Sequence, residues 1–302
     1  MHIYNKSLIN IMINLIYIHI GNKKISYLND SIKQALIFNQ DINVYLISNK
    51  KIFESISPKI KKKIIFKDIN KIILKKNHIN FNKYSLLDVV WYKGFWRFAT
   101  ERFFYLQNIV ETENLKNIVH VENDVMIYFD IGSIIKTIKK NYNIGLLLDS
   151  NEQAIPSFLY FKDLKNINKF VYFFEKQHSF INMLIGLTFG KIYSILFDKY
   201  FFNNNDMDVL FKFYLANLKN KKIGVLPSAT PTLIKNKQYS KNINICKHYK
   251  KFGGIFDPAR FGAYNFGFDI NPIFKNVTPD IKKPTFKSAV DVTKYKIYFK
   301  LI

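Results

Sequence analysis

The chain has 302 residues, with 46 Lys and Arg against 22 Asp and Glu and a formal net charge of +24. Hydrophobic residues make up 48% of it, and it holds only 11 glycines and 8 prolines, which excludes a collagenous, linker-like or generally disordered chain. The single cysteine, Cys246, excludes an intramolecular disulfide framework and a cysteine-rich zinc site.

The positive charge at first sight indicates an anionic partner such as nucleic acid or a membrane. Arginine, however, occurs only at Arg97, Arg102 and Arg260, so the other 43 basic residues are lysine. Lys, Ile, Asn, Tyr and Phe, all abundant here, have A/T-rich codons, and we interpret most of the charge as the background of such a genome and not as a nucleic-acid surface. The rare arginines then indicate places that need a planar, bidentate cation.

The first elements form a βαβ unit. The apolar segment 8–20 has 13 residues, fewer than the roughly 20 of a membrane span, and we predict that it is a buried strand. A turn at Gly21 and Asn22, a helix over 27–40 and a strand over 43–48 follow. We therefore expect a soluble, cytoplasmic protein and leave peripheral membrane contact open.

The later segments continue the alternation of helices and strands. Residues 59–76 alternate in the same way, 84–110 have a helical period with Phe95, Phe98, Phe103 and Leu106 on one side, and 117–121 form a strand. We expect a further apolar strand at 125–129, strands at 144–148 and 223–226, helices near 164–176 and 206–218, and a helical insertion at 170–196. The pattern predicts one α/β domain over 1–302 with a mostly parallel central sheet.

The sharpest motif is a pair of carboxylates, Glu122 and Asp124, directly after the apolar strand at 117–121. Residues two apart in a strand or tight turn point the same way, so both carboxylates can face one point. Two such groups at the end of a buried strand are typical of a Mg²⁺ or Mn²⁺ site shared with phosphates. A plain polar loop is the alternative.

Three other segments stand out. Residues 91–106 hold both tryptophans, Arg97 and Arg102, which indicates either aromatic core packing or an arginine for a diphosphate. Residues 250–269 hold four glycines and Arg260, which indicates a close approach to a ligand or a structural turn. Asp206 and Asp208 start a predicted helix, where a carboxylate serves as a cap or as a general base.

In this order the motifs resemble GT-A glycosyltransferases over about residues 12–270. The similarity is to viral and bacterial members with the motif H-x-E-N-D-V, here 120–125, and a later F-D-x-x-x-x-G-x-Y, here 256–264. The resemblance implies a GT-A, Rossmann-like sheet, with a donor-binding half at about 12–130 and an acceptor half at about 131–302. It also implies a nucleotide-sugar donor, UDP-sugar above all, and a hydroxyl acceptor on a glycan or protein.

The same resemblance assigns roles to individual residues. Mn²⁺ or Mg²⁺ would bridge the diphosphate to Asp124 and Glu122. Many members add a C-terminal histidine, but no histidine follows His248 here, so the further ligand would be Asp257, with Asp269, His248 or no further protein ligand as alternatives. Asp206 or Asp208 would be the base for the acceptor. The donor would be contacted by six residues: His19, Gly21, Arg97, Arg102, Asn123 and Tyr264.

Two other classes of function stay open at this point. Metal-dependent nucleases and nucleotidyltransferases also use paired carboxylates on a sheet, and Asp130 and Asp149 are available as further ligands. An inactive sugar- or nucleotide-binding module would keep the fold without the reaction.

Overall fold

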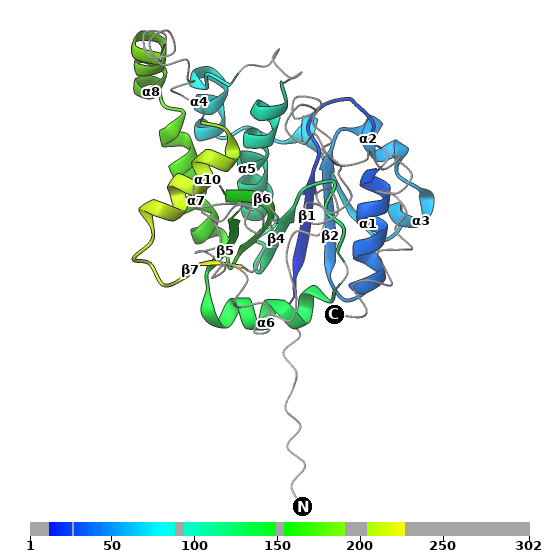
Figure 1. Cartoon of the computed structure of the whole chain (residues 1–302). Helices are drawn as coiled ribbons and strands as arrows, with labels where there is room; N and C mark the ends of the chain where they lie inside the picture. The colour runs from blue at the N-terminus through cyan, green and yellow to red at the C-terminus, as the bar shows by residue number, and fades with distance from the viewer. Residues whose placement is uncertain are drawn as a thin grey trace, which may run out of the picture.

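A seven-stranded sheet lies between two layers of helices (Figure 1). The structure, a computed structural model, describes residues 12–25, 27–87, 94–127, 129–148, 154–190 and 204–226. Asp149 and the whole glycine-rich segment 250–269, with Asp257, Arg260 and Tyr264, lie outside the described residues.

The strands lie side by side in the order β3-β2-β1-β4-β6-β5-β7. In this sheet β6 is antiparallel to its neighbours β4 and β5, and the other pairings are parallel. The predicted mostly parallel α/β architecture is therefore confirmed. The strands are β1 (Asn14–Ile18), β2 (Asn43–Ser48), β3 (Ile65–Asp68), β4 (Ile118–Val121), β5 (Ile144–Leu148), β6 (Ala154–Phe161) and β7 (Ile223–Val225).

Each face of the sheet has its own apolar core. One face packs against α4 (Lys76–Tyr84), α5 (Phe95–Thr112), α7 (Leu164–Gln177) and α10 (Asp206–Ala216). The other packs against α1 (Tyr27–Phe38), α2 (Lys50–Ser55), α3 (Pro58–Lys61) and α6 (Ile131–Asn141). The short 3₁₀ turn η1 (Ile69–Lys71) follows β3, and α8 (Phe180–Ile185) continues into the π-helical turn η3 (Gly186–Gly190).

The central strand β1 shows why the sheet needs both layers. Its side chains alternate, so Ile16 and Ile18 enter one core while Leu15 and Tyr17 enter the other. All five residues of β1 are buried, as expected of a parallel strand that is covered on both faces.

Most predicted elements are observed, with four corrections. Residues 125–127 belong to no strand, so the predicted strand at 125–129 is wrong. Residues 84–110 are not one helix, because α4 ends at Tyr84, residues 85–87 are not helical and α5 begins at Phe95. Phe95 does not share the buried side of α5 with Phe103 and Leu106, because Phe95 is exposed and the other two are buried. Strand β6 and helix α6 were not predicted.

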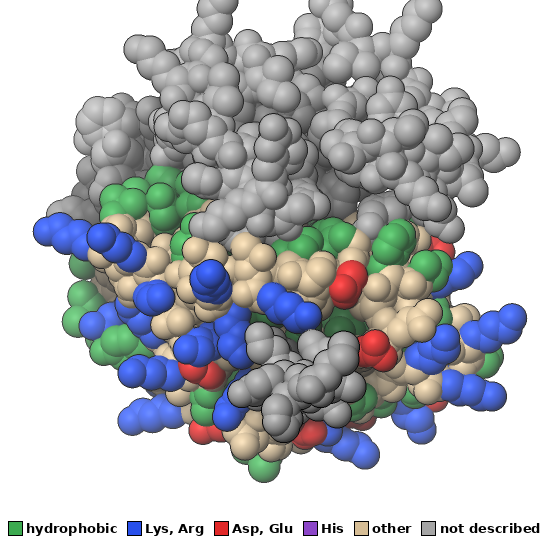
Figure 2. Space-filling model, turned by 90° about the horizontal axis from the view of Figure 1, so that it is seen from below, with side chains coloured by type: hydrophobic (Ala, Val, Ile, Leu, Met, Phe, Trp, Pro, Cys, Tyr) green, Lys and Arg blue, Asp and Glu red, His purple; other side chains and the backbone are tan. Residues whose placement is uncertain are grey.

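The basic side chains are scattered on the face of the molecule that Figure 2 shows. On the face that contains α6, Lys and Arg side chains are spread among apolar and neutral ones and do not form one continuous patch (Figure 2). This distribution agrees with the interpretation of lysine as a compositional background. Within the described parts of the chain, no helix has the length and apolar character to span a membrane.

Candidate functional site

The strand order changes direction between β1 and β4. From β1 the chain builds outward through β2 to β3, and then returns to add β4 on the other side of β1. Ligands of open α/β sheets bind in the crevice at the carboxyl ends of the strands at such a point. His19 follows β1 and Glu122 follows β4, so both lie at this crevice.

Glu122 continues the side-chain alternation of β4. His120 contacts the ring of Phe103 on the face covered by α5, and Glu122, two residues later, reaches the same helix layer. The backbone N–H of Glu122 still donates to Ser157 O of β6 at 3.1 Å, and Val125 N then donates to Glu122 O at 3.2 Å. The chain therefore leaves the strand in a tight turn that holds Asn123 and Asp124.

Asp124 and Glu122 lie close enough to repel each other. Asp124 is exposed to solvent, and yet its pKa is raised to about 6. The main cause is loss of hydration among the surrounding atoms, and the second is the negative charge of Glu122. The two carboxylates therefore lie near each other, and their convergence on one metal ion stays a prediction.

Arg102 on α5 joins this motif to a distant helix. Its Nη1 lies 2.8 Å from Glu122 Oε1, and its Nη2 lies 2.7 Å from Asp206 Oδ2 at the start of α10. Burial alone would lower the pKa of Arg102, but the carboxylates of Glu122 and Asp206 outweigh it and raise the pKa. A planar fork that holds two carboxylates explains why this chain keeps an arginine here.

Asp206 is almost completely enclosed, with 2% of its surface exposed. Its pKa is raised to about 6, chiefly by burial, while Arg102 acts in the opposite direction. The cap of α10 is neither Asp206 nor Asp208 but Asn205, whose side chain accepts from Asp208 N at 3.0 Å. The predicted capping role of the aspartates is therefore corrected, and their role as acceptor base stays a prediction.

His19, Gly21 and Asn123 lie near the carboxyl end of β1. Asn123 Nδ2 donates to Ile18 O at 3.1 Å and lies 3.3 Å from His19 Nδ1. Because His19 Nε2 lies 3.0 Å from the carbonyl oxygen of Lys23, which can only accept, the ring proton is on Nε2. Burial lowers the pKa of His19, which keeps the ring neutral. Gly21 has φ 103°, a left-handed conformation that favours glycine.

Tyr27 is a site residue that the sequence reasoning missed. It is the first residue of α1, and its pKa is raised to about 12, first by burial and then by the charges of Asp124 and Glu122. Its ring is still partly exposed. Its position at the start of the helix that follows β1 was the available signal.

The residues fit a bound divalent cation and its polyanionic partner. Two carboxylates are hard oxygen ligands, and a cation would relieve the repulsion that raises the pKa of Asp124. Three buried atoms around them, Arg102 Nε, His120 Nε2 and Asn123 Oδ1, have no hydrogen-bond partner, which such groups normally obtain from protein, water or ligand. Among the described residues, no group of three or more His, Cys, Asp or Glu is placed to hold a metal.

Two predicted residues are used elsewhere. The Arg97 guanidinium donates to Asn82 O and Oδ1 at 3.1 and 3.0 Å, and it is not brought to the acidic pair. Asp130, the additional ligand of the nuclease alternative, caps α6 by accepting from Gly132 N and Ser133 N.

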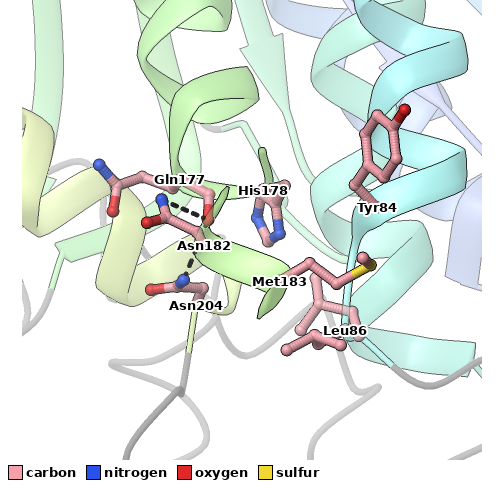
Figure 3. A pocket seen from close by; sticks show the side chains of 8 residues that line it. Tyr84, Leu86, Gln177, His178, Asn182, Met183 and Asn204 are labelled. Carbon is pink, nitrogen blue, oxygen red and sulfur yellow. Dashed lines mark hydrogen bonds between the residues drawn. The ribbon is translucent and has the colours of Figure 1, made fainter. Parts of the chain in front are cut away.

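A separate small cavity lies between the ends of α4 and α7 and the start of α8 (Figure 3). Its volume of about 20 Å³ suits a single water and not a sugar. Asn182 Nδ2 and Asn204 Nδ2 both donate to Gln177 O beside it, at 3.3 and 3.2 Å (Figure 3). Burial, then the charges of Lys212 and Arg97, lower the pKa of the adjoining His178 to about 3.

Comparisons with known proteins give distant likenesses to solved structures. No protein-family model matches the chain, and no curated protein matches its sequence. The chain is similar to mouse xyloside xylosyltransferase 1, with 10% identity and a TM-score of 0.44 over 81% of this chain and 94% of that one. It is also similar to the galactosyltransferase LgtC, with 12% identity and a TM-score of 0.40 over 77% and 83% of the two chains. The third likeness is to the PaToxG glycosyltransferase, with 14% identity and a TM-score of 0.39 over 80% and 86%.

Proposed function

We propose that the protein is a metal-dependent GT-A glycosyltransferase that moves a sugar from a nucleotide-sugar, a UDP-sugar, to a hydroxyl acceptor on a glycan or protein. The observation that carries the proposal is the pair Glu122 and Asp124 at the switch point of the sheet, held from behind by Arg102. The order of motifs in the sequence supports the same family.

In this proposal Asp124 and Glu122 would hold Mn²⁺ or Mg²⁺, with Asp257 as a further ligand. When bound, the metal neutralises negative charge on the departing nucleoside diphosphate. Arg102 occupies one oxygen of Glu122, which fixes the direction of that carboxylate. Asp124, which is exposed, is then the more accessible ligand.

The neighbouring residues would bind the nucleotide and prepare the site. His19, Gly21 and Asn123 lie near the carboxyl end of β1, where the nucleoside would bind, and Tyr27 has a partly exposed ring near the acidic pair. Arg97 and Tyr264 stay predicted donor contacts. Asp206 is a positioning residue through Arg102, and its role as acceptor base, like that of Asp208, is the untested part of the proposal.

A thermal-shift panel tests the function directly. UDP, other nucleoside diphosphates and their sugars are added with and without Mn²⁺, and the melting temperature is measured. We expect stabilisation by one nucleotide that requires the metal, because a ligand that binds only the folded state raises stability. The absence of a metal-dependent shift with every nucleotide would contradict the proposal, and a shift without hydrolysis or transfer would indicate an inactive binding module.

Metal affinity should depend on pH in a defined window. The pKa of Asp124 is about 6 in the folded chain, so protons compete with the metal below that pH. We expect Mn²⁺ affinity to be constant above about pH 7 and to fall about tenfold per pH unit below pH 6 for one competing proton. Isothermal titration calorimetry across this range measures it, and equal affinity at pH 5 and pH 8 would contradict the assignment of Asp124 as a ligand.

A further inference from the structure

Helix α8 and the turn η3 form an apolar projection at the upper left of Figure 1, beside α4 and beyond the end of α7. Their sequence over 180–190, FINMLIGLTFG, has no charged residue, and no residue of α8 is buried. Four apolar side chains at a spacing of three or four positions are exposed, and we call them the stripe: Ile181, Leu184, Ile185 and Leu187. An exposed apolar stripe of this kind marks a contact surface.

Contacts made by three other residues of α8 attach the helix to the body of the protein. Asn182 Nδ2 donates to Lys176 O at 2.7 Å, Met183 lines the small cavity, and the ring of Phe180 packs edge-on against Tyr84. These contacts hold the helix in a fixed direction. The exposed stripe therefore faces away from the protein.

Basic side chains flank the stripe. Lys176 is exposed in the last turn of α7, just before α8, and Lys83 is exposed in the last turn of α4, next to the Tyr84 that contacts α8. The nearby acidic side chain, Glu175, is engaged by Asn80 Nδ2 at 3.1 Å. The apolar stripe is therefore bordered by positive charge, in a chain whose net charge is +24.

We propose that the α8–η3 stripe binds the surface of an anionic membrane. A short apolar helix with lysines at its border is typical of interfacial attachment, in which apolar side chains enter the lipid boundary and lysines contact anionic headgroups. A second copy of this chain is less compatible, since two surfaces with the same strong positive charge repel each other.

Vesicle flotation of the full chain tests the proposal with matched variants. Leu187 and Leu218 are 58% and 59% exposed, but Leu218 follows the far end of α10. Leu187→Asp should lower binding to phosphatidylcholine vesicles that contain phosphatidylglycerol by about tenfold, the order expected for losing one buried leucine. Leu218→Asp should leave binding unchanged.

The electrostatic part is tested separately. Binding should weaken with added salt, with vesicles of phosphatidylcholine alone and in the double variant Lys83→Glu and Lys176→Glu. Equal flotation of the two Leu→Asp variants, or equal binding to neutral vesicles, would overturn the proposal. So would a dimer in analytical ultracentrifugation that Leu187→Asp dissociates. If circular dichroism shows that Leu187→Asp is unfolded, Leu184→Asn on the same stripe takes its place.

Discussion

Asp124→Asn is expected to reduce glycosyl transfer by a hundred- to a thousandfold and to remove Mn²⁺-dependent nucleotide binding, while the chain stays folded. The variant loses the more accessible of the two metal-binding carboxylates, and losses of about this size follow removal of one group that stabilises the transition-state charge. Initial rates and calorimetry with Mn²⁺ and nucleotide measure both effects.

The change in the stability of Asp124→Asn relative to the wild type is expected to depend on pH. The pKa of Asp124 in the folded chain, about 6, lies above its ordinary value of 3.8, so the ionised form is disfavoured by folding. Ionisation of Asp124 therefore lowers the stability of the wild type as the pH rises from about 4 to about 6, and Asp124→Asn lacks this contribution. Without metal, the melting temperature of the variant should exceed that of the wild type at pH 7.5 by more than it does at pH 4.5.

A matched control distinguishes loss of a metal ligand from a general effect of removing a carboxylate. Asp130→Asn replaces a carboxylate that caps α6, six residues after Asp124, and should leave transfer and metal binding unchanged. Transfer by Asp124→Asn at the wild-type rate would show that the metal assignment is wrong.

Arg102→Met is expected to destabilise the chain by about 3–5 kcal/mol, as found when one partner of a buried ion pair is removed. Arg102 is 8% exposed, and its loss leaves Asp206 enclosed without its cation and Glu122 without its anchor. Urea unfolding measures the free-energy change. Metal-dependent nucleotide binding should fall as well, because Glu122 is no longer held in place.

Two further variants isolate the role of the two carboxylates. Adding Asp206→Asn to Arg102→Met should recover part of the stability, and the double-mutant cycle gives the coupling energy. Arg97→Met removes a guanidinium that donates to the neutral side chain and the carbonyl of Asn82 and lies 5.5 Å from the centre of the Phe81 ring, and it should cost about 1 kcal/mol. If Arg102→Met lost less stability than Arg97→Met, the role of Arg102 as a bridge between the two carboxylates would be contradicted.

The sequence was informative wherever the pattern is local. The β-branched run at β1, the helical spacing of Leu28, Ile32 and Ala35 in α1, and the run at β2 identify their elements without tertiary information. The acidic pair after β4 was also visible, because polar residues interrupt apolar sequence there. These features place Glu122 and Asp124 correctly at a strand end.

The remaining features depend on contacts between distant residues. Val125 and Ile127 are buried in the core beside α1, so they are apolar like a strand although they pair with none. The direction of β6 and its place between β4 and β5 are set by the whole sheet. The bridge from Arg102 to Asp206 spans 104 positions, and nothing within either segment specifies the other.

The pairing of β1 with β4 has a consequence for how the protein folds. Partners such as Tyr17 and Val121 are about one hundred positions apart, so this pairing closes a long loop and is expected to form slowly. Until it forms, the unit of β1, β2 and β3 presents β1 as an open edge that is apolar except for Asn14, and other chains can extend this edge. During synthesis, one edge of β1 therefore stays unpaired until β4 has been made and has paired with it. In this interval the chain is most prone to aggregate.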